Sequence, residues 1–522
     1  MDQFHRMNFW DAPRSILTNH LTWLWLLIGF LFLPFAAWQT VIPLAAWLAP
    51  IFLLRFSRLS RRALVALPLI FLAFAAGNTI TSRGLAFNLL GFLGNNLLKA
   101  LLWTLPYAAD RLIGSRLKGW TRLLVFPMAF TVVDWIMSLL RVSSSGSPAY
   151  SQYDNLALMQ IVSVIGMWGL TFLIMWCAST VNELWEHGFD WRPVRGMVGV
   201  FVGVLLGALL FGSARLTFAA PDATTVPVAA VTGDSAISRA AAGAIDMNFG
   251  QSTDAERAAV RPTFERTVNL MLARTETALR GGARIVGWEE GSGTVLEEDK
   301  QQTLDRAAAL AKQYGAYLEV SLGVLTRTGA LPFLRNQSIL IDPAGRVLWT
   351  YDKSHLVPFD EAFFTIPGNG VLPVADTPYG RLSTAICYDT YFPPLLRQAG
   401  QNGVDILITP ANDTPMYAES AAAMDRMRAV ENGVALVRPT GHGLTIITDS
   451  EGRVLGSQNY FTDSSGILLT TVPVHGVRTI YSRVGDLFAY LCAAGLMLLA
   501  GWVLLRRGRL AAAAARLVPN SR

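Results

Sequence analysis

The hydrophobic and polar positions divide the chain into three parts. Over residues 1–218, apolar residues form long runs, which predict helices that cross a bilayer. Over residues 219–480, short apolar runs alternate with more polar, helix-like patterns, as in a globular α/β domain. Residues 481–522 hold one more apolar run and a basic tail. We therefore predict an N-terminal membrane domain, a globular domain, and a C-terminal transmembrane helix with a cytoplasmic tail.

Seven candidate spans precede the globular domain, and an eighth follows it. The first two are short and close together, so they form either a tight helical hairpin or a single element kinked at Pro34. The predicted spans cover residues 21–36, 39–54, 61–80, 87–109, 119–140, 158–182, 196–217 and 485–505.

The composition also favours a membrane location. Only 15% of the 522 residues are charged and 52% are hydrophobic, whereas soluble domains carry about 25% charged residues. The net charge of +6 does not indicate nucleic-acid binding, because the cations gather beside the apolar runs, as they do in cytoplasmic loops. The alternate loops are poor in cations, with Arg83 in one and Arg141 bordering another. Eight spans with both termini in the cytoplasm would place residues 219–480 on the periplasmic side of a bacterial inner membrane.

The globular domain alternates between strand and helix patterns, which predicts an α/β fold with sheets covered by helices. Strands are predicted at 226–231, 285–290, 318–325, 338–351 with a turn at 342–345, 384–389 and 405–409. Helices are predicted at 254–279, 299–314, 394–399 and 424–432.

Three β-rich runs, at 285–290, 347–353 and 384–389, carry residues of complementary chemistry at or near their ends: Glu290, Lys353 and Cys387. A carboxylate can act as a general base, a fixed ammonium can stabilise an oxyanion, and a thiolate can attack a carbonyl carbon. Taken singly, each has an ordinary explanation as a carboxylate in a surface turn, a solvated lysine or a small buried hydrophobe. Cys387 is the only cysteine of the globular domain, because Cys177 and Cys492 lie in apolar runs. We predict that the three side chains form one catalytic site.

No metal site is signalled, since the sequence has neither Cys-x-x-Cys nor His-Glu-x-x-His, and we expect no metal or other cofactor. Two ionisable residues, Lys99 and Asp134, lie within the predicted spans. Because an isolated charge in hydrocarbon is costly, we predict either a structural pair between them or a position nearer the interface, with a substrate role as the alternative.

Two motifs resemble the apolipoprotein N-acyltransferase family, the membrane branch of the nitrilase superfamily. They are Tyr-Asp-Lys-Ser-His-Leu-Val-Pro-Phe-Asp-Glu at 351–361 and Ile-Cys-Tyr-Asp at 386–389, and residues 426–431, 438–440 and 479–486 also match. The resemblance implies a polytopic α-helical membrane domain beside a nitrilase-like α-β-β-α sandwich. It assigns the general base to Glu290, with Glu289 as the intervening residue of a Trp-x-Glu pattern.

The same resemblance assigns the remaining roles of the site. Lys353 would be the catalytic lysine, Cys387 the nucleophile, and Glu361 a second glutamate that supports the lysine. The backbone N–H of Tyr388 would belong to the oxyanion hole.

The chain departs from the family pattern in several places. Residues 146–150 are Gly-Ser-Pro-Ala-Tyr where the family usually has Gly-Phe-Pro-Trp, and residues 411–417 lack the usual Trp-Phe-Gly. Asp389 replaces a glutamate, and His442 stands where an asparagine is usual. We expect these positions to shape the substrate pocket, so the chain is interpreted as a divergent member.

The resemblance implies an acyltransferase that moves a fatty acyl chain from a membrane phospholipid, through a Cys387 thioester, to the N-terminal amine of a diacylglyceryl-modified lipoprotein. We expect a monomer. The alternatives are a membrane-anchored amidohydrolase, in which water resolves the thioester, and a non-catalytic scaffold. A transferase must keep water from the thioester, and the candidate apolar covers are 359–367, with Phe363 and Phe364 at its centre, and 393–396.

Overall fold

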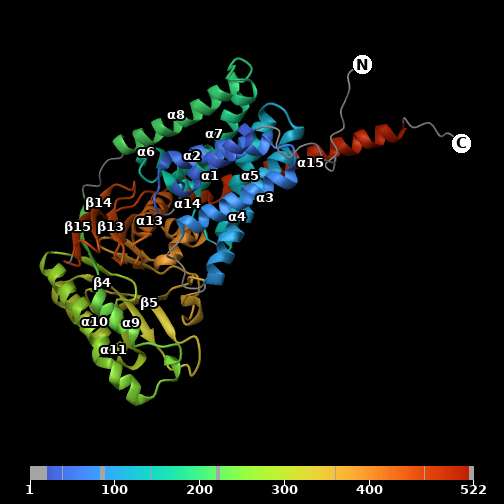
Figure 1. The fold of residues 1–522 in the computed structure, drawn as a ribbon. Coiled ribbons are helices and arrows are strands. Elements are labelled where there is room, and N and C mark those ends of the chain that lie inside the picture. Colours follow the sequence, from blue (N-terminus) through green and yellow to red (C-terminus); the bar gives the residue numbers. More distant parts are fainter. Residues whose placement is uncertain are drawn as a thin grey trace.

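The helices of the N-terminal part gather at one end of the molecule, and two β-sheets lie at the other (Figure 1). The computed structural model describes residues 20–37, 39–82, 89–140, 143–218, 224–358, 360–463 and 465–516. Predictions that involve Arg83, Arg141 and Phe359 lie outside the described residues.

A helix lies in each of the eight apolar segments. These helices are α1 (His20–Phe32), α2 (Pro43–Leu59), α3 (Ala63–Thr81), α4 (Leu89–Leu112), α5 (Trp120–Leu139), α7 (Val162–Glu186), α8 (Arg195–Phe218) and α15 (Leu487–Arg516). Helices α1 and α2 pack side by side, so the first two segments form a hairpin. Within the described ranges, α3, α5, α7, α8 and α15 are long and apolar enough to cross a membrane. The number of crossings stays a prediction.

The sixth predicted span is interrupted near its start. The short helix α6 (Leu156–Met159) precedes α7, and inside α7 the backbone of Gly166 has a φ of 68°. A Cβ atom at Gly166 would lie 2.6 Å from the ring of Tyr481, so only glycine fits this kink. The N–H of the next residue, Met167, donates to the carboxylate of Glu431 at 2.6 Å. This hydrogen bond connects α7, one of the helices of the N-terminal part that we call the membrane-side helices, to α13 (Ala418–Asn432) of the α/β part.

The first sheet has the strand order β15-β1-β2-β4-β5-β6, with β3 beside β4. Its strands are β1 (Thr225–Val231), β2 (Ile285–Trp288), β3 (Gly293–Leu296), β4 (Tyr317–Leu325), β5 (Leu334–Ile341), β6 (Val347–Asp352) and β15 (Ile467–Pro473). Strands β1, β2 and β4 are parallel, and β5, β6 and β15 are added antiparallel. Its outer face is covered by α10 (Asp254–Arg280) and α11 (Lys300–Tyr314), with α9 (Ser235–Gly243) against α10.

The second sheet has the order β14-β13-β11-β9-β8-β7. Its strands are β7 (Val374–Thr377), β8 (Gly380–Thr384), β9 (Ile406–Ile408), β11 (Ala435–Arg438), β13 (Leu444–Thr448) and β14 (Val454–Asn459), and β10 (Ala411–Asn412) pairs with β12 (Thr440–Gly441) beside them. Helices α12 (Pro393–Gln401) and α13 lie on this side of the molecule.

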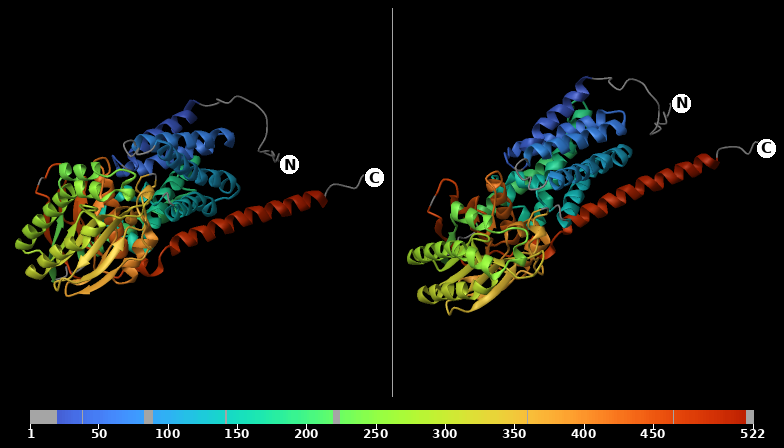
Figure 2. Two further views of the ribbon diagram at one scale, coloured as in Figure 1. Left: turned by 90° about the horizontal axis from the view of Figure 1, so that it is seen from below. Right: turned by 60° about the horizontal axis from the view of Figure 1, so that its bottom comes forward.

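The layers confirm the predicted α-β-β-α sandwich. Apolar residues of both sheets, such as Val228, Ile285, Leu382 and Ile406, form one continuous core between them. Helix α13 lies between the second sheet and α7: Ala429 packs toward the sheet core, whereas other α13 residues join the core of the membrane-side helices. Beyond the sandwich, α14 (Ile480–Val484) leads into α15, which extends away from the sheets along the helical part (Figure 2).

Candidate active site

Lys353 is the centre of the candidate site. It follows the last residue of β6, and its side chain is 1% exposed. Its Nζ lies 2.7 Å from Oε1 of Glu290 and 2.6 Å from Oε1 of Glu361. Burial opposes the charged ammonium, but the two carboxylates outweigh it and hold the pKa of Lys353 well above its usual range. Lys353 is therefore a fixed cation between two carboxylates.

Glu290 lies just beyond β2, which ends at Trp288, two residues before the end of the predicted strand. Besides Lys353, its Oε1 accepts a hydrogen bond of 2.8 Å from Nδ2 of Asn336, at the start of β5. The neighbouring Glu289 is also buried, and burial raises the pKa of its carboxyl group to about 8. Of Glu289 and Glu290, it is Glu290 that contacts the Lys353 ammonium. Both carboxylates are buried, so neither is the surface carboxylate that a turn would favour.

Glu361 begins a short 3-10 helix, Glu361–Phe363, in the segment between β6 and β7. Its Oε1 contacts Lys353 and also accepts the N–H of Val357 at 2.8 Å. Burial raises the pKa of Glu361, and Lys353 opposes this shift. The three charged side chains predicted from the motifs thus meet in one place.

Cys387 lies at a turn and not at a strand end. Strand β8 ends at Thr384, and Cys387 opens a 3-10 turn with a φ of 47°, a region that non-glycine residues seldom adopt. The turn is fixed because the N–H of Cys387 donates to the Pro410 carbonyl and the hydroxyl of Thr390 donates to the Cys387 carbonyl, both at 2.8 Å. Such backbone strain is often found at functional sites.

The thiol of Cys387 is protonated at rest. Burial and the nearby Glu290 carboxylate raise its pKa well above the usual value, while Lys353 and the backbone N–H of Asn412 oppose the shift. A thiol attacks as thiolate, so it needs a base at the moment of reaction. The charge of Glu290 acts on both Lys353 and Cys387, and Glu290 remains the predicted base.

Asp389 has a role that the sequence did not indicate. Because aspartate stands here where the family usually has glutamate, the sequence predicts a position in the substrate pocket. In the structure the Asp389 side chain is 0% exposed, and its partners are protein groups. Its carboxylate accepts the N–H of Ile386 at 3.2 Å, the N–H of His355 at 2.7 Å and the hydroxyl of Tyr351 at 2.8 Å. Asp389 therefore ties the turn of the cysteine to the segment of the lysine.

A second buried cluster, centred on Arg438, holds the other side of the turn Cys387–Tyr391, which we call the nucleophile turn. Arg438, at the end of β11, forms ion pairs with Asp413 at 3.0 Å and with Asp425 of α13 at 2.5 Å. Asp425 also accepts the hydroxyl of Thr390 at 2.5 Å. These bonds connect the divergent 411–417 segment, the nucleophile turn and α13. In the sequence, Arg438 lies in one of the matching stretches, 438–440, but its partners could not be predicted from it.

The divergent 146–150 segment lies between the membrane-side helices and the site. Just before it, Ser144 donates to the carbonyl of Tyr391, in the nucleophile turn, through its N–H at 3.1 Å and its hydroxyl at 2.7 Å. The Tyr150 hydroxyl accepts from Arg428 of α13 at 2.6 Å. The ring of Tyr388 packs against Tyr391, whereas the role of the Tyr388 N–H stays a prediction.

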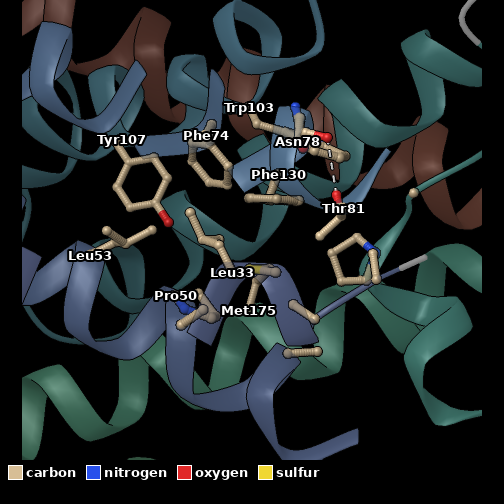
Figure 3. Close-up of a pocket in the computed structure, with 16 residues that line it drawn as sticks. Leu33, Pro50, Leu53, Phe74, Asn78, Thr81, Trp103, Tyr107, Phe130 and Met175 are labelled. Carbon is tan, nitrogen blue, oxygen red and sulfur yellow. Dashed lines mark hydrogen bonds between the residues drawn. The ribbon is translucent and has the colours of Figure 1, made fainter. Parts of the chain in front are cut away.

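A cavity opens among the membrane-side helices. Its wall is mainly apolar, with Leu53, Phe74 and Phe130 facing one another, and Tyr107 lies at one side (Figure 3). Gly146 and Pro148 of the divergent segment also line it. The cavity is therefore bounded by the same loop that contacts the nucleophile turn.

One of the two predicted covers is wrong. Residues 393–396 form the first turn of α12, and Leu395 and Leu396 are buried in the core cluster that includes the second sheet, because the Pro-Pro pair starts a helix there. In 359–367, Phe363 is exposed, whereas Phe364 stacks on Phe333 and is partly buried.

The predicted contact between Lys99 and Asp134 is replaced by contacts with one loop. Lys99 donates to the hydroxyl and carbonyl of Ser145 at 3.0 and 3.1 Å. Asp134 accepts the hydroxyls of Ser147 at 2.6 Å and Thr171 at 2.8 Å. Both side chains are buried within the protein, and their depth in the membrane stays a prediction.

Fold and site together define a nitrilase-type sandwich joined to a bundle of apolar helices. A family model of the carbon-nitrogen hydrolases matches residues 240–481, and a model of the apolipoprotein N-acyltransferase N-terminal domain matches residues 29–180. With both halves matched in one chain, the protein belongs to the apolipoprotein N-acyltransferase family.

Two relatives have names that agree with this assignment. The apolipoprotein N-acyltransferase of Geobacter metallireducens is 28% identical over 421 residues, 75% of this chain and 76% of the relative. That of Shewanella oneidensis is 25% identical and covers 74% of each chain. Among solved structures, an amidase from Nesterenkonia sp. covers 51% of this chain and 95% of its own, with 20% identity and a TM-score of 0.39.

Proposed function

We propose that this protein is an N-acyltransferase that carries a fatty acyl chain from a membrane phospholipid to the N-terminal amine of a diacylglyceryl-modified lipoprotein. The relatives, which are named apolipoprotein N-acyltransferases, support this proposal. One observation carries the proposal. A cysteine lies beside a buried Glu-Lys-Glu cluster, and the loop that contacts the turn of this cysteine also borders an apolar cavity.

In the first step, Glu290 takes the proton of Cys387 and the sulfur attacks the ester carbonyl carbon of the phospholipid. Lys353 and the N–H of Tyr388 stabilise the oxyanion of the tetrahedral intermediate. The ester C–O bond breaks, the lysophospholipid leaves with the proton returned by Glu290, and a thioester remains on Cys387.

In the second step, the lipoprotein amine attacks the thioester carbonyl. Glu290 takes a proton from the amine, the C–S bond breaks, and an amide forms while the thiol is regenerated. Glu361 holds Lys353 in place through both steps, since it is the second carboxylate on that ammonium. The apolar cavity suits an acyl chain, because its wall offers hydrocarbon contact next to the site.

The proposal places the enzyme as a monomer in the bacterial inner membrane, with residues 219–480 on the periplasmic side. The distribution of cations between loops supports this orientation. A reporter inserted at Gly329, in an exposed turn of the α/β part, should behave as exported. A reporter active only in the cytoplasm would refute the orientation.

The thioester is tested by mass spectrometry of the purified full-length protein after incubation with phospholipid. We expect one added acyl group on Cys387, released by neutral hydroxylamine and absent in Cys387→Ala. Cys177→Ala and Cys492→Ala are the controls and should load normally, because both residues lie in helices of the membrane part. Normal loading of Cys387→Ala would exclude this cysteine as the nucleophile.

The acceptor distinguishes a transferase from a hydrolase. The acyl group should persist for many minutes in detergent and leave rapidly when a diacylglyceryl peptide with a free N-terminus is added. Prompt release of fatty acid without an acceptor, or turnover of simple amides to ammonia, would instead support the amidohydrolase.

A further inference from the structure

Three arginines from separate segments converge on an open cleft of about 750 Å³ at the base of the last helix. Arg381 comes from β8, Arg478 from the segment before α14, and Arg483 from α14 itself. The end of α12 forms the rest of the wall, including Gly403 just beyond it. The cleft is separate from the catalytic cluster, since α12, nine residues and roughly 13 Å long, lies between it and the nucleophile turn.

The arginines are held so that part of each guanidinium stays available. Arg381 donates to the Asn402 carbonyl at 2.6 Å and to Asp376 at 2.8 Å. Arg478 donates to the Gly403 carbonyl at 2.9 Å and lies 3.9 Å from Asp405.

Glycine at 403 is required for this arrangement. Its φ is 69°, and a Cβ atom there would lie 2.8 Å from the Arg478 guanidinium, which therefore rests directly on the backbone. Within the described residues, Arg483 forms no ion pair. Three guanidinium groups against the carboxylates of Asp376 and Asp405 leave one positive charge in the cleft.

The position of Arg483 indicates which kind of ligand this positive charge binds. Ile480, Arg483 and Val484 are exposed and share one face of α14, because residues three and four apart are neighbours on a helix. Exposed apolar residues continue into α15 at Leu487 and Leu491. Arg483 therefore lies between exposed apolar side chains, at the point where the chain enters the last predicted span.

We propose that this cleft binds the phosphodiester of an anionic glycerophospholipid. Guanidinium groups bind phosphate oxygens with paired hydrogen bonds, and the single net charge matches one phosphodiester. The proposed topology puts this cleft on the non-cytoplasmic side, at the start of the last predicted span. The inference rests on the membrane placement in the proposed function but not on the thioester.

The test uses full-length Cys387→Ala in detergent, so that acyl loading does not interfere. Phosphatidylglycerol is titrated and the bound lipid is counted by native mass spectrometry. Adding Arg478→Gln and Arg483→Gln should weaken one bound lipid by about 30-fold, since each arginine near an anionic lipid strengthens binding about fivefold. Phosphatidylcholine should bind more weakly than phosphatidylglycerol.

The control variant adds Arg280→Gln and Arg346→Gln, which remove the same charge from exposed sites that do not line the cleft and should leave lipid binding unchanged. Equal lipid binding by the cleft variant and its parent would overturn the proposal. So would displacement of the lipid by millimolar inorganic phosphate, which would assign the cleft to free phosphate. Acyl loading of the protein with Cys387 intact is measured in parallel, so failure of the proposed function is seen separately.

Discussion

Two buried lysines in this protein have opposite surroundings. Lys353 in the candidate site contacts two carboxylates, of Glu290 and Glu361. Lys99 in the membrane part donates to the hydroxyl and carbonyl of Ser145, and the nearby carboxylate of Asp134 receives hydroxyl groups of the same loop and of α7.

The difference separates two uses of a buried charge. Around Lys353, opposite charges keep the ammonium ionised beside the thiol, which is what an oxyanion requires. Around Lys99 and Asp134, neutral groups of the 143–147 loop are the partners, so these side chains act on the loop that contacts Tyr391. The first cluster is the one we propose for the chemistry, and the second contacts a segment beside it.

The largest effect is expected from Lys353→Met. The change removes the oxyanion cation and leaves Glu290 and Glu361 buried without a counter-ion, so acyl loading of Cys387 should fall by about 10³-fold or more. Loading is measured by mass spectrometry over time. Lys99→Met is the matched control and should keep loading within about tenfold, because its loss costs hydrogen bonds to one loop. Equal loss in both variants would remove the distinction between the two lysines.

Asp389→Asn should come next. The amide keeps the size of the side chain but loses its charge, and it cannot accept all the backbone and hydroxyl donors that now converge there. We expect acyl loading to fall by about 10- to 100-fold, with the pH of half-maximal loading displaced because the turn of Cys387 shifts against Lys353. A lower melting temperature with an unchanged pH profile would assign Asp389 a purely structural role.

The third prediction concerns Glu319, a buried carboxyl group whose raised pKa should lower the stability of the folded protein as the pH rises. Burial raises the pKa of Glu319, between the two sheets, to about 8 from the usual 4.5, against hydrogen bonds from Ser338 and the Trp288 N–H. Between these pH values the unfolded chain has released a proton that the folded chain keeps, so stability declines as the pH rises from 4.5 to 8. Glu319→Gln should flatten this decline by up to about 1.4 kcal/mol per pH unit. The measurement is denaturant unfolding from pH 5 to 8, and an unchanged slope would contradict the prediction.

The smallest effect is expected from Asp134→Asn. The amide oxygen can still accept one hydroxyl, so loss of the charge should cost about 1 kcal/mol of stability and reduce acyl loading less than tenfold. Thermal unfolding and the loading assay measure both. A loss as large as that of Lys353→Met would give Asp134 a part in the reaction.

Much of the fold could be predicted because apolar runs and strand patterns are local. The helix over 254–279 is an example: Thr253 and Glu256 form a capping box at its start, and both residues stand in the sequence. The kink at Gly166 could not be predicted, because its cause, the ring of Tyr481, lies more than 300 positions away.

The site divides in the same way. Glu290, Lys353 and Glu361 could be named from motifs, and the structure brings them together. The turn at Cys387 was mistaken for a strand end, because the apolar residues before it continue past the last ladder hydrogen bond. The roles of Asp389 and Arg438 depend on partners from distant elements, which no local pattern specifies.

The pairing of β1 with β15 has a consequence for the whole architecture. Thr225, which follows the membrane-side helices, stands opposite Pro473, which precedes α14 and α15. The chain thus enters and leaves the sandwich at adjacent positions of one sheet, as in a domain inserted into a helical protein. We expect such a module to be exchangeable between relatives at these two positions, because both junctions move together.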